Sequence, residues 1–166
     1  MSRPPKTGHR EKFTPSLLDR LVDLNPGQAY ETYNPDGLSL SEYLSCIQRD
    51  LQDLLNTRQH FTEEQMDRHE EAKNSLLVYG FPELNSVNRV NVQTRHRLAS
   101  AIENAIRMFE PRLVGVRVVP LPNESSIGEV RFRVEALARA EPSPERVVFD
   151  TTLDLDRQEC RVMGEQ

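Results

Sequence analysis

The strongest constraint on the fold is a change in hydrophobic period near Pro111. Before it, two segments carry apolar residues every three or four positions, which is the spacing of one helical face. After it, apolar and polar residues alternate, as in strands with one buried face and one wet face. Helices followed by strands are typical of an α+β domain. We therefore expect two main helices packed on a small, mostly antiparallel sheet of three to four strands, preceded by an extended N-terminal arm.

The two helices are expected over residues 40–56 and 94–109. Ser39 and Glu42 fit a capping box at the start of the first helix, and Thr94 is the expected N-cap of the second. Pro111 ends the second helix, because proline disfavours the helical conformation in the residue before it. The apolar stripes comprise Leu40, Tyr43, Leu44, Ile47, Leu51, Leu54 and Leu55 in the first helix, and Leu98, Ala101, Ile102, Ala105, Ile106 and Phe109 in the second.

The strands are expected over residues 113–119, 130–136, 147–155 and 159–163. The loops at 120–128 and 140–145 are short and rich in Pro, Gly and Ser, which suits antiparallel hairpin connections. Together with the helices, these strands predict a single domain over residues 38–163.

Residues 1–37 are predicted to form the extended arm. They hold five of the eleven prolines and little apolar patterning, so most of the segment lacks the means to build a core. The exception is a short apolar helical turn at 16–22, which carries Leu17, Leu18 and Leu21. This turn either packs back onto its own domain or is a peptide anchor held out to a partner, and the sequence alone favours neither.

Charge and hydropathy exclude several classes of function. The balance of 21 Lys+Arg against 26 Asp+Glu argues against a dedicated nucleic-acid-binding protein. No stretch approaches about 18 consecutive apolar residues, so a transmembrane helix is not expected. The basic N-terminus has no apolar run behind it, so a secretory signal is not expected either. The charge is uneven, because residues 94–139 carry eight arginines against five acids.

The residues that commonly carry catalysis or bind metals lack the necessary spacing. The four histidines and two cysteines form no metal-ligand pattern, and there is no nucleophile elbow or Gly-rich phosphate loop. Glycoside hydrolysis requires two facing carboxylates, for which only Glu83 and Glu110 lie suitably beside apolar runs. We therefore expect no catalytic residue, no metal and no cofactor.

The segment Glu110-Pro111-Arg112 stands out at the predicted junction between helix and strand. In extended backbone, residues two apart face the same way, so Glu110 and Arg112 can lie side by side. One interpretation is a structural ion pair that locks the junction. The other is a rigid charged fork presented to a partner, since arginine suits bidentate carboxylate contacts.

The strands also carry arginines, at Arg117, Arg131 and Arg133, on the face that is expected to be wet. Such a face is usually only solvated. It could equally receive an acidic partner, which would make the protein a generic adaptor.

Four motifs in series resemble the TssE family of type VI secretion baseplate subunits, within the lysozyme-like, GPW-type baseplate wedge family of phage tails. They are Leu17-Leu18-Asp19-Arg20-Leu21, the segment at 50–58 that contains Asp50-Leu51 and Leu54-Leu55, the segment Tyr79-Gly80-Phe81-Pro82-Glu83-Leu84, and Glu110-Pro111-Arg112-Leu113. Each motif alone is weak, but their order and separation are specific, and together they span about residues 15–163.

This resemblance implies structural work in a cytoplasmic bacterial baseplate docked at the inner membrane, with no direct membrane insertion. The implied partners are the wedge subunits TssF, TssG and TssK, the spike hub VgrG, and the sheath subunits TssB and TssC. The resemblance makes Glu110, Pro111 and Arg112 a signature partner contact, to which the leucines of the arm are added as an anchor. The family label leaves one alternative, a peptidoglycan-cleaving enzyme that would use Glu83 and Glu110.

Overall fold

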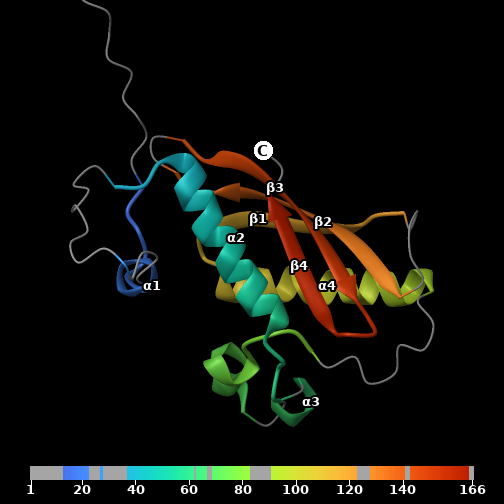
Figure 1. Cartoon of the computed structure of the whole chain (residues 1–166). Coiled ribbons are helices and arrows are strands. Elements are labelled where there is room, and N and C mark those ends of the chain that lie inside the picture. Colours follow the sequence, from blue (N-terminus) through green and yellow to red (C-terminus); the bar gives the residue numbers. More distant parts are fainter. Residues whose placement is uncertain are drawn as a thin grey trace, which may run out of the picture.

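The computed structural model describes residues 13–22, 27, 37–61, 63–66, 69–82, 91–122, 128–140 and 143–164. Helices come first and strands follow (Figure 1). The elements are α1 (Leu17–Leu21), α2 (Leu40–Asn56), α3 (Glu63–Met66), the 3₁₀ turns η1 (Glu70–Asn74) and η2 (Leu76–Val78), α4 (Val92–Phe109), β1 (Leu113–Pro120), β2 (Glu129–Ala138), β3 (Glu145–Asp154) and β4 (Glu159–Gly164).

The starts of the two long helices are fixed by local hydrogen bonds. In α2 the predicted capping box forms, because Ser39 Oγ accepts from the Glu42 N–H and the Glu42 carboxylate accepts from the Ser39 N–H at 2.8 Å. The predicted N-cap of α4 is wrong. Asn91 takes that position, since its side-chain oxygen accepts from the Thr94 N–H at 2.7 Å, and Thr94 lies inside the first turn.

The four strands form one antiparallel sheet in the order β1-β2-β3-β4. The register between β1 and β2 shifts between Val114 and Arg117, where Gly115 has a φ of 64°. A residue in this left-handed conformation marks a β-bulge, which glycine adopts at low cost. At the other side of the sheet, β4 pairs with β3 only from Phe149 onward, so among the described residues the segment 145–148 of β3 has a strand partner on the β2 side alone.

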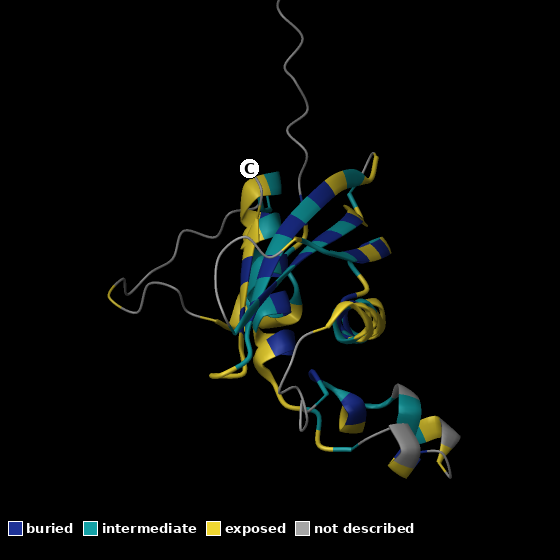
Figure 2. Cartoon of the chain, turned by 90° about the vertical axis from the view of Figure 1, so that its right-hand side faces the viewer, coloured by how far each residue is buried: buried dark blue, intermediate teal, exposed yellow. Residues whose placement is uncertain are grey.

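The core lies between one face of the sheet and the two long helices. Buried residues alternate with more exposed ones along the strands (Figure 2), as the period of two predicts. α4 packs on β1, and α2 packs on β4. One continuous apolar cluster includes Ile47, Leu51, Ile102, Ile106 and Phe132, each of them almost wholly removed from solvent.

The predicted α+β class, the two helices and the antiparallel sheet are confirmed. None of the described helices is both long and apolar enough to cross a membrane.

The N-terminal segment over residues 13–22 contacts the domain at its beginning. The rings of Phe13 and Tyr43 stack with centroids 4.5 Å apart, and Phe13 exchanges two backbone hydrogen bonds with Leu38. The predicted helical turn forms α1. The remainder of the predicted arm, apart from residues 27 and 37, lies outside the described residues.

Candidate functional site

The Glu110-Pro111-Arg112 junction forms the predicted ion pair. Glu110 is the C-cap of α4, and its N–H donates to the Ile106 carbonyl at 2.8 Å. Arg112 turns back on it, with Nε donating to Glu110 Oε1 at 2.7 Å and the Arg112 backbone N–H donating to the same oxygen at 3.1 Å. Arg112 Nη2 also pairs with Oε2. The Glu110 side chain is only 5% exposed, so the junction holds a buried carboxylate that depends on Arg112.

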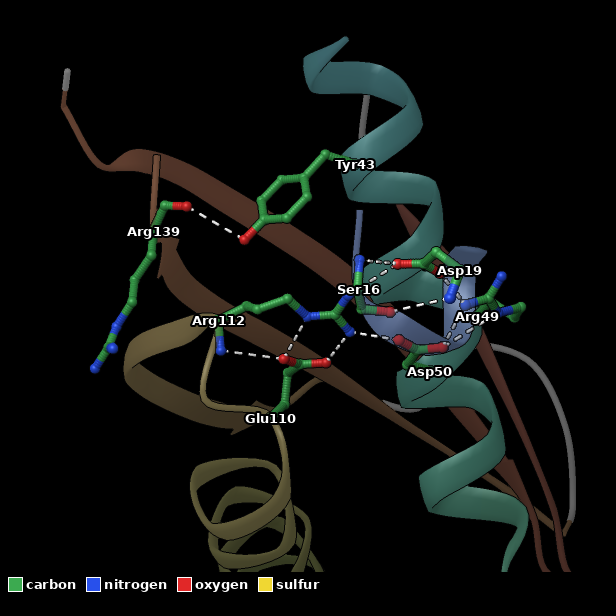
Figure 3. Close-up of polar contacts among 8 residues, drawn as sticks. All are labelled: Ser16, Asp19, Tyr43, Arg49, Asp50, Glu110, Arg112 and Arg139. Atoms are coloured by element: carbon green, nitrogen blue, oxygen red, sulfur yellow. Dashed lines mark hydrogen bonds and ion pairs between the residues drawn. The ribbon is translucent and has the colours of Figure 1, made fainter. Parts of the chain in front are cut away.

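Two residues of α2 extend this pair into a cluster (Figure 3). Arg112 Nη2 donates to Asp50 Oδ2 at 2.5 Å, and Arg49 donates to Asp50 Oδ1 from Nη2 at 2.8 Å and from Nε at 3.1 Å. Asp50 therefore lies between two guanidinium groups. Because the contact joins α2 to the start of β1, it ties the helical layer to the sheet at the junction.

Asp19 brings α1 into the same cluster. Arg49 Nη2 donates to Asp19 Oδ1 at 2.5 Å, and Arg112 Nη1 lies 3.9 Å from Asp19 Oδ2 (Figure 3). The same carboxylate closes a capping box, in which the Ser16 N–H donates to Oδ2 at 3.0 Å and Ser16 Oγ accepts from the Asp19 N–H at 3.1 Å. The side chain of Asp19 is only 6% exposed. One side chain thus both starts α1 and holds it on the domain.

The electrostatics of Asp19 match this arrangement. Burial alone would raise the pKa of this carboxyl, but hydrogen bonds from Ser16 and Arg49 outweigh burial and lower the pKa to about 2. Asp19 therefore stays ionised at physiological pH, as the contact with both arginines requires.

The leucines of α1 are exposed to solvent. No residue of α1 is buried, and Leu17 and Leu21 are 73% and 72% exposed, with Leu18 also exposed. The helix is thus held through its polar side, and its apolar side remains uncovered by the described residues.

A pocket of about 400 Å³ opens beside the cluster. It brings together four of the six residues predicted to bind a partner, from two motifs more than ninety positions apart in the sequence. Leu17 and Leu21 do not line it. Its lining residues are Ser16, Leu18, Asp50, Asp53, Leu54, Tyr79, Phe109, Glu110, Pro111 and Arg112.

Sequence reasoning missed Arg49, Asp50, Asp53 and Tyr79 as parts of this site. The motifs pointed to the segments that contain three of them, because Asp50 and Asp53 lie in the motif at 50–58 and Tyr79 begins the motif at 79–84. Arg49 falls outside the four motifs, and only the fold places it beside Asp19.

A second hollow, of about 720 Å³, lies between α2 and the part of β3 that β4 does not cover. Its walls combine apolar side chains with those of two serines, a glutamine and an arginine, and residues 146–149 of β3 border it. Its lining residues are Leu40, Ser41, Leu44, Ser45, Gln48, Arg146, Val147, Val148, Phe149 and Gly164.

The arginines of the outer sheet face are partly neutralised. Arg133 Nε donates to Asp150 Oδ1 at 2.9 Å, and Arg131 Nη2 lies 4.0 Å from Asp150 Oδ2. One carboxylate between two guanidinium groups weakens the case for a surface that captures acidic partners.

The described residues do not allow the predicted pair of carboxylates, Glu83 and Glu110, to be assessed as a catalytic pair. Glu83 lies outside the described residues, and Glu110 is engaged by Arg112. Within the described ranges, no three His, Cys, Asp or Glu side chains are grouped so that they could hold a metal ion.

These features define a class of protein, an α+β domain with a docked N-terminal helix, a pocket at an ion-paired junction and an open sheet edge. The family model described as baseplate wedge protein gp25 matches residues 41–143, which is more than half of the chain. The chain therefore belongs to the gp25 baseplate wedge family, a family of structural baseplate components. The resemblance to baseplate wedge proteins predicted from the motifs is confirmed.

Comparison with solved structures and curated proteins adds two observations. The chain is similar to a chain of "The baseplate complex from the type VI secretion system", with 14% sequence identity and a TM-score of 0.46, over 76% of this chain and 96% of that one. No curated protein sequence matches.

Proposed function

We propose that this protein is a TssE-type subunit of a type VI secretion baseplate, assembled in the bacterial cytoplasm at the inner membrane. It joins the wedge subunits TssF, TssG and TssK around the spike hub VgrG, and it provides the platform on which the TssB and TssC sheath begins. Membership of the baseplate wedge family supports the first part, and the series of four motifs supports the second. Residues 1–37 act as the arm, with an anchor at 16–22, and residues 38–163 act as the baseplate domain.

The observation that carries this proposal is the meeting of the arm motif and the junction motif at one pocket, to which the motifs at 50–58 and 79–84 also contribute. Leu18 comes from the arm motif, and Glu110, Pro111 and Arg112 come from the junction. The ion pairs of Asp19 and Arg112 hold the two motifs together, and the pocket beside them gives both motifs one shared surface. A composite docking site for the wedge subunits requires such a surface.

The two interpretations of the Glu-Pro-Arg segment combine in this site. Arg112 holds Glu110, Asp50 and α1 in place, which is the structural role. Because α1 is held by its polar side, the exposed Leu17 and Leu21 form a fixed apolar ridge before any partner arrives. A helix that is already ordered loses less conformational entropy when it binds. The segment therefore contributes to docking both directly and through α1.

Catalysis is not part of the proposed role. A glycosidase needs a carboxylic acid that delivers a proton to the leaving group. Glu110 instead accepts hydrogen bonds from the side chain and the backbone of Arg112. A charge-paired acceptor of this kind is poorly placed to act as that acid, so we infer a structural protein rather than a muramidase.

In this proposal, sheath initiation uses the side of the sheet away from β1. Residues 145–148 have no partner on the β4 side among the described residues, and with the hollow beside them they suit an added strand from a sheath subunit. Backbone hydrogen bonds would provide the pairing, and Leu44 and Phe149 would cover the apolar side chains of the incoming strand. Repeated copies around a ring would make these individually weak contacts strong through multivalency.

Replacing both Leu17 and Leu21 by serine tests the proposed docking role of the arm. The folded chain should keep its stability, because both side chains are exposed. Binding to a purified TssF–TssG complex should weaken by about 10- to 100-fold, the loss expected when two apolar anchors are removed from an interface. Affinity is measured by biolayer interferometry, with thermal unfolding as the check on folding.

Leu76→Ser is the matched control, since Leu76 is 80% exposed and lies in η2, away from the pocket lining. It should bind like the wild type. Wild-type affinity in the Leu17→Ser/Leu21→Ser variant would show that the arm is not an anchor.

A further inference from the structure

The lining of the pocket at the junction carries an excess of negative charge. Asp50, Asp53 and Glu110 line it together with a single guanidinium, that of Arg112. When Asp19 and Arg49 of the adjoining cluster are added, the site holds four carboxylates and two guanidinium groups. The internal ion pairs therefore leave two negative charges unbalanced.

Asp53 carries the part of this charge that remains available. It lies three residues after Asp50, so both carboxylates project from one side of α2. Asp50 is engaged by Arg49 and Arg112. The Asp53 side chain is exposed, and the structure gives it no ion pair or hydrogen bond with any described residue.

Apart from Ser16, the rest of the pocket is apolar and partly aromatic. The rings of Tyr79 and Phe109 meet edge to face, with centroids 5.0 Å apart and planes at 70°. Leu18, Leu54 and Pro111 complete the apolar walls. A cation placed against an aromatic face gains electrostatic attraction from the ring, and arginine makes this contact more often than lysine.

The negative charge of the pocket acts on the Tyr79 hydroxyl. Its pKa is raised, first by burial and then by the charges of Asp53, Asp50 and Glu110. A phenol at the pocket wall is therefore influenced by the same three carboxylates that line it.

We infer that the pocket accepts a basic side chain, an arginine, from the partner that docks on the junction. The guanidinium would pair with the Asp53 carboxylate, and its flat face and alkyl stem would pack on Tyr79, Phe109 and Leu18. An apolar side chain fits less well, because it would strip water from Asp53 without providing a hydrogen bond. For the identity of the partner, the inference rests on the proposed function. The chemistry of the pocket rests on its lining residues alone.

A peptide titration tests the chemistry without the baseplate. The probes are the blocked tripeptides Ala-Arg-Ala and Ala-citrulline-Ala, which differ in charge but hardly in shape, added to the ¹⁵N-labelled full chain up to about 10 mM. The arginine peptide should shift the amides of Asp53, Tyr79 and Phe109 in a saturable way. It should bind about threefold to fivefold more weakly to Asp53→Asn, the loss expected for a partly exposed ion pair, and unchanged to the control Glu159→Gln. Equal shifts from both peptides, or no shifts at these amides, would overturn the inference.

The same variants in the TssF–TssG binding assay separate this inference from the proposed function. If an arginine occupies the pocket, Asp53→Asn weakens wedge binding and Asp53→Lys abolishes it, while Glu159→Lys has no effect. If an apolar group occupies it, Asp53→Asn binds as tightly as the wild type or more tightly, and the inference is wrong although the docking site stands. Failure of the wild-type chain to bind the wedge would count against the proposed function, and the peptide titration would still decide the chemistry of the pocket.

Discussion

Replacing Arg112 by alanine is expected to lower the free energy of unfolding by about 3 kcal/mol, the cost of leaving one member of a buried ion pair without its partner. The Glu110 carboxylate would lose its guanidinium partner while remaining almost fully buried. Asp50 and Asp19 would each lose a positive neighbour, so α1 would also loosen. Urea unfolding followed by circular dichroism measures the first effect, and amide exchange in residues 17–21 measures the second.

Two controls keep the stability result interpretable. Arg131→Ala removes a half-exposed arginine beside Asp150 and should change stability by less than about 0.5 kcal/mol. Adding Glu110→Gln to Arg112→Ala should recover part of the loss, because the buried charge is gone. If Arg112→Ala is as stable as Arg131→Ala, the junction does not lock the fold. In that case Arg112 would serve partner contact alone.

The second large effect is expected in Leu44→Asp, a change that should abolish sheath formation without unfolding the chain. Leu44 lies in the hollow between α2 and the uncovered edge of β3, and it packs only partly against the core. A strand inserted there would bury the new carboxylate without a partner, which is strongly unfavourable. Fluorescently labelled sheath subunits in cells report whether sheaths assemble.

The matched control for this change is Met108→Asp, which places the same carboxylate on the exposed side of α4, outside the hollow. It should leave sheath assembly intact. Wild-type sheath assembly in Leu44→Asp, with the protein still incorporated in the baseplate, would rule out this hollow as the site of strand addition.

The sequence predicted the fold well because local periodicity decides most of it. The helical stripe around Ile47 and Leu51 and the alternation around Phe132 each identify an element without knowledge of the rest of the chain. The start of α4 was predicted wrongly for a local reason. Both Asn91 and Thr94 are residue types that cap helices. The residue types alone do not decide at which of the two positions the helix begins, and in the structure Asn91 is the cap.

The site was predicted in part. The Glu110–Arg112 pair was predicted from spacing in extended backbone, and the pair is present. The backbone premise was wrong, because residues 110–113 form a turn in which the Leu113 N–H donates to the Glu110 carbonyl at 3.1 Å. The wider cluster could not be derived that way, because Asp19, Asp50 and Arg112 meet only once α1, α2 and β1 are packed together. Local spacing carries no information on such long-range contacts. The motif series pointed to the segments involved, whereas the pairing itself had to be seen in the structure.

The central claim is that the arm and the Glu-Pro-Arg junction together form one docking site for the baseplate wedge. Hydrogen exchange on the full chain, alone and in complex with TssF–TssG, tests it most directly. The account predicts that residues 17–21 and 112–113 become protected together in the complex, and that Leu76–Val78 stays unchanged. A complex that forms without protection of either segment, or that protects only one of them, would contradict it.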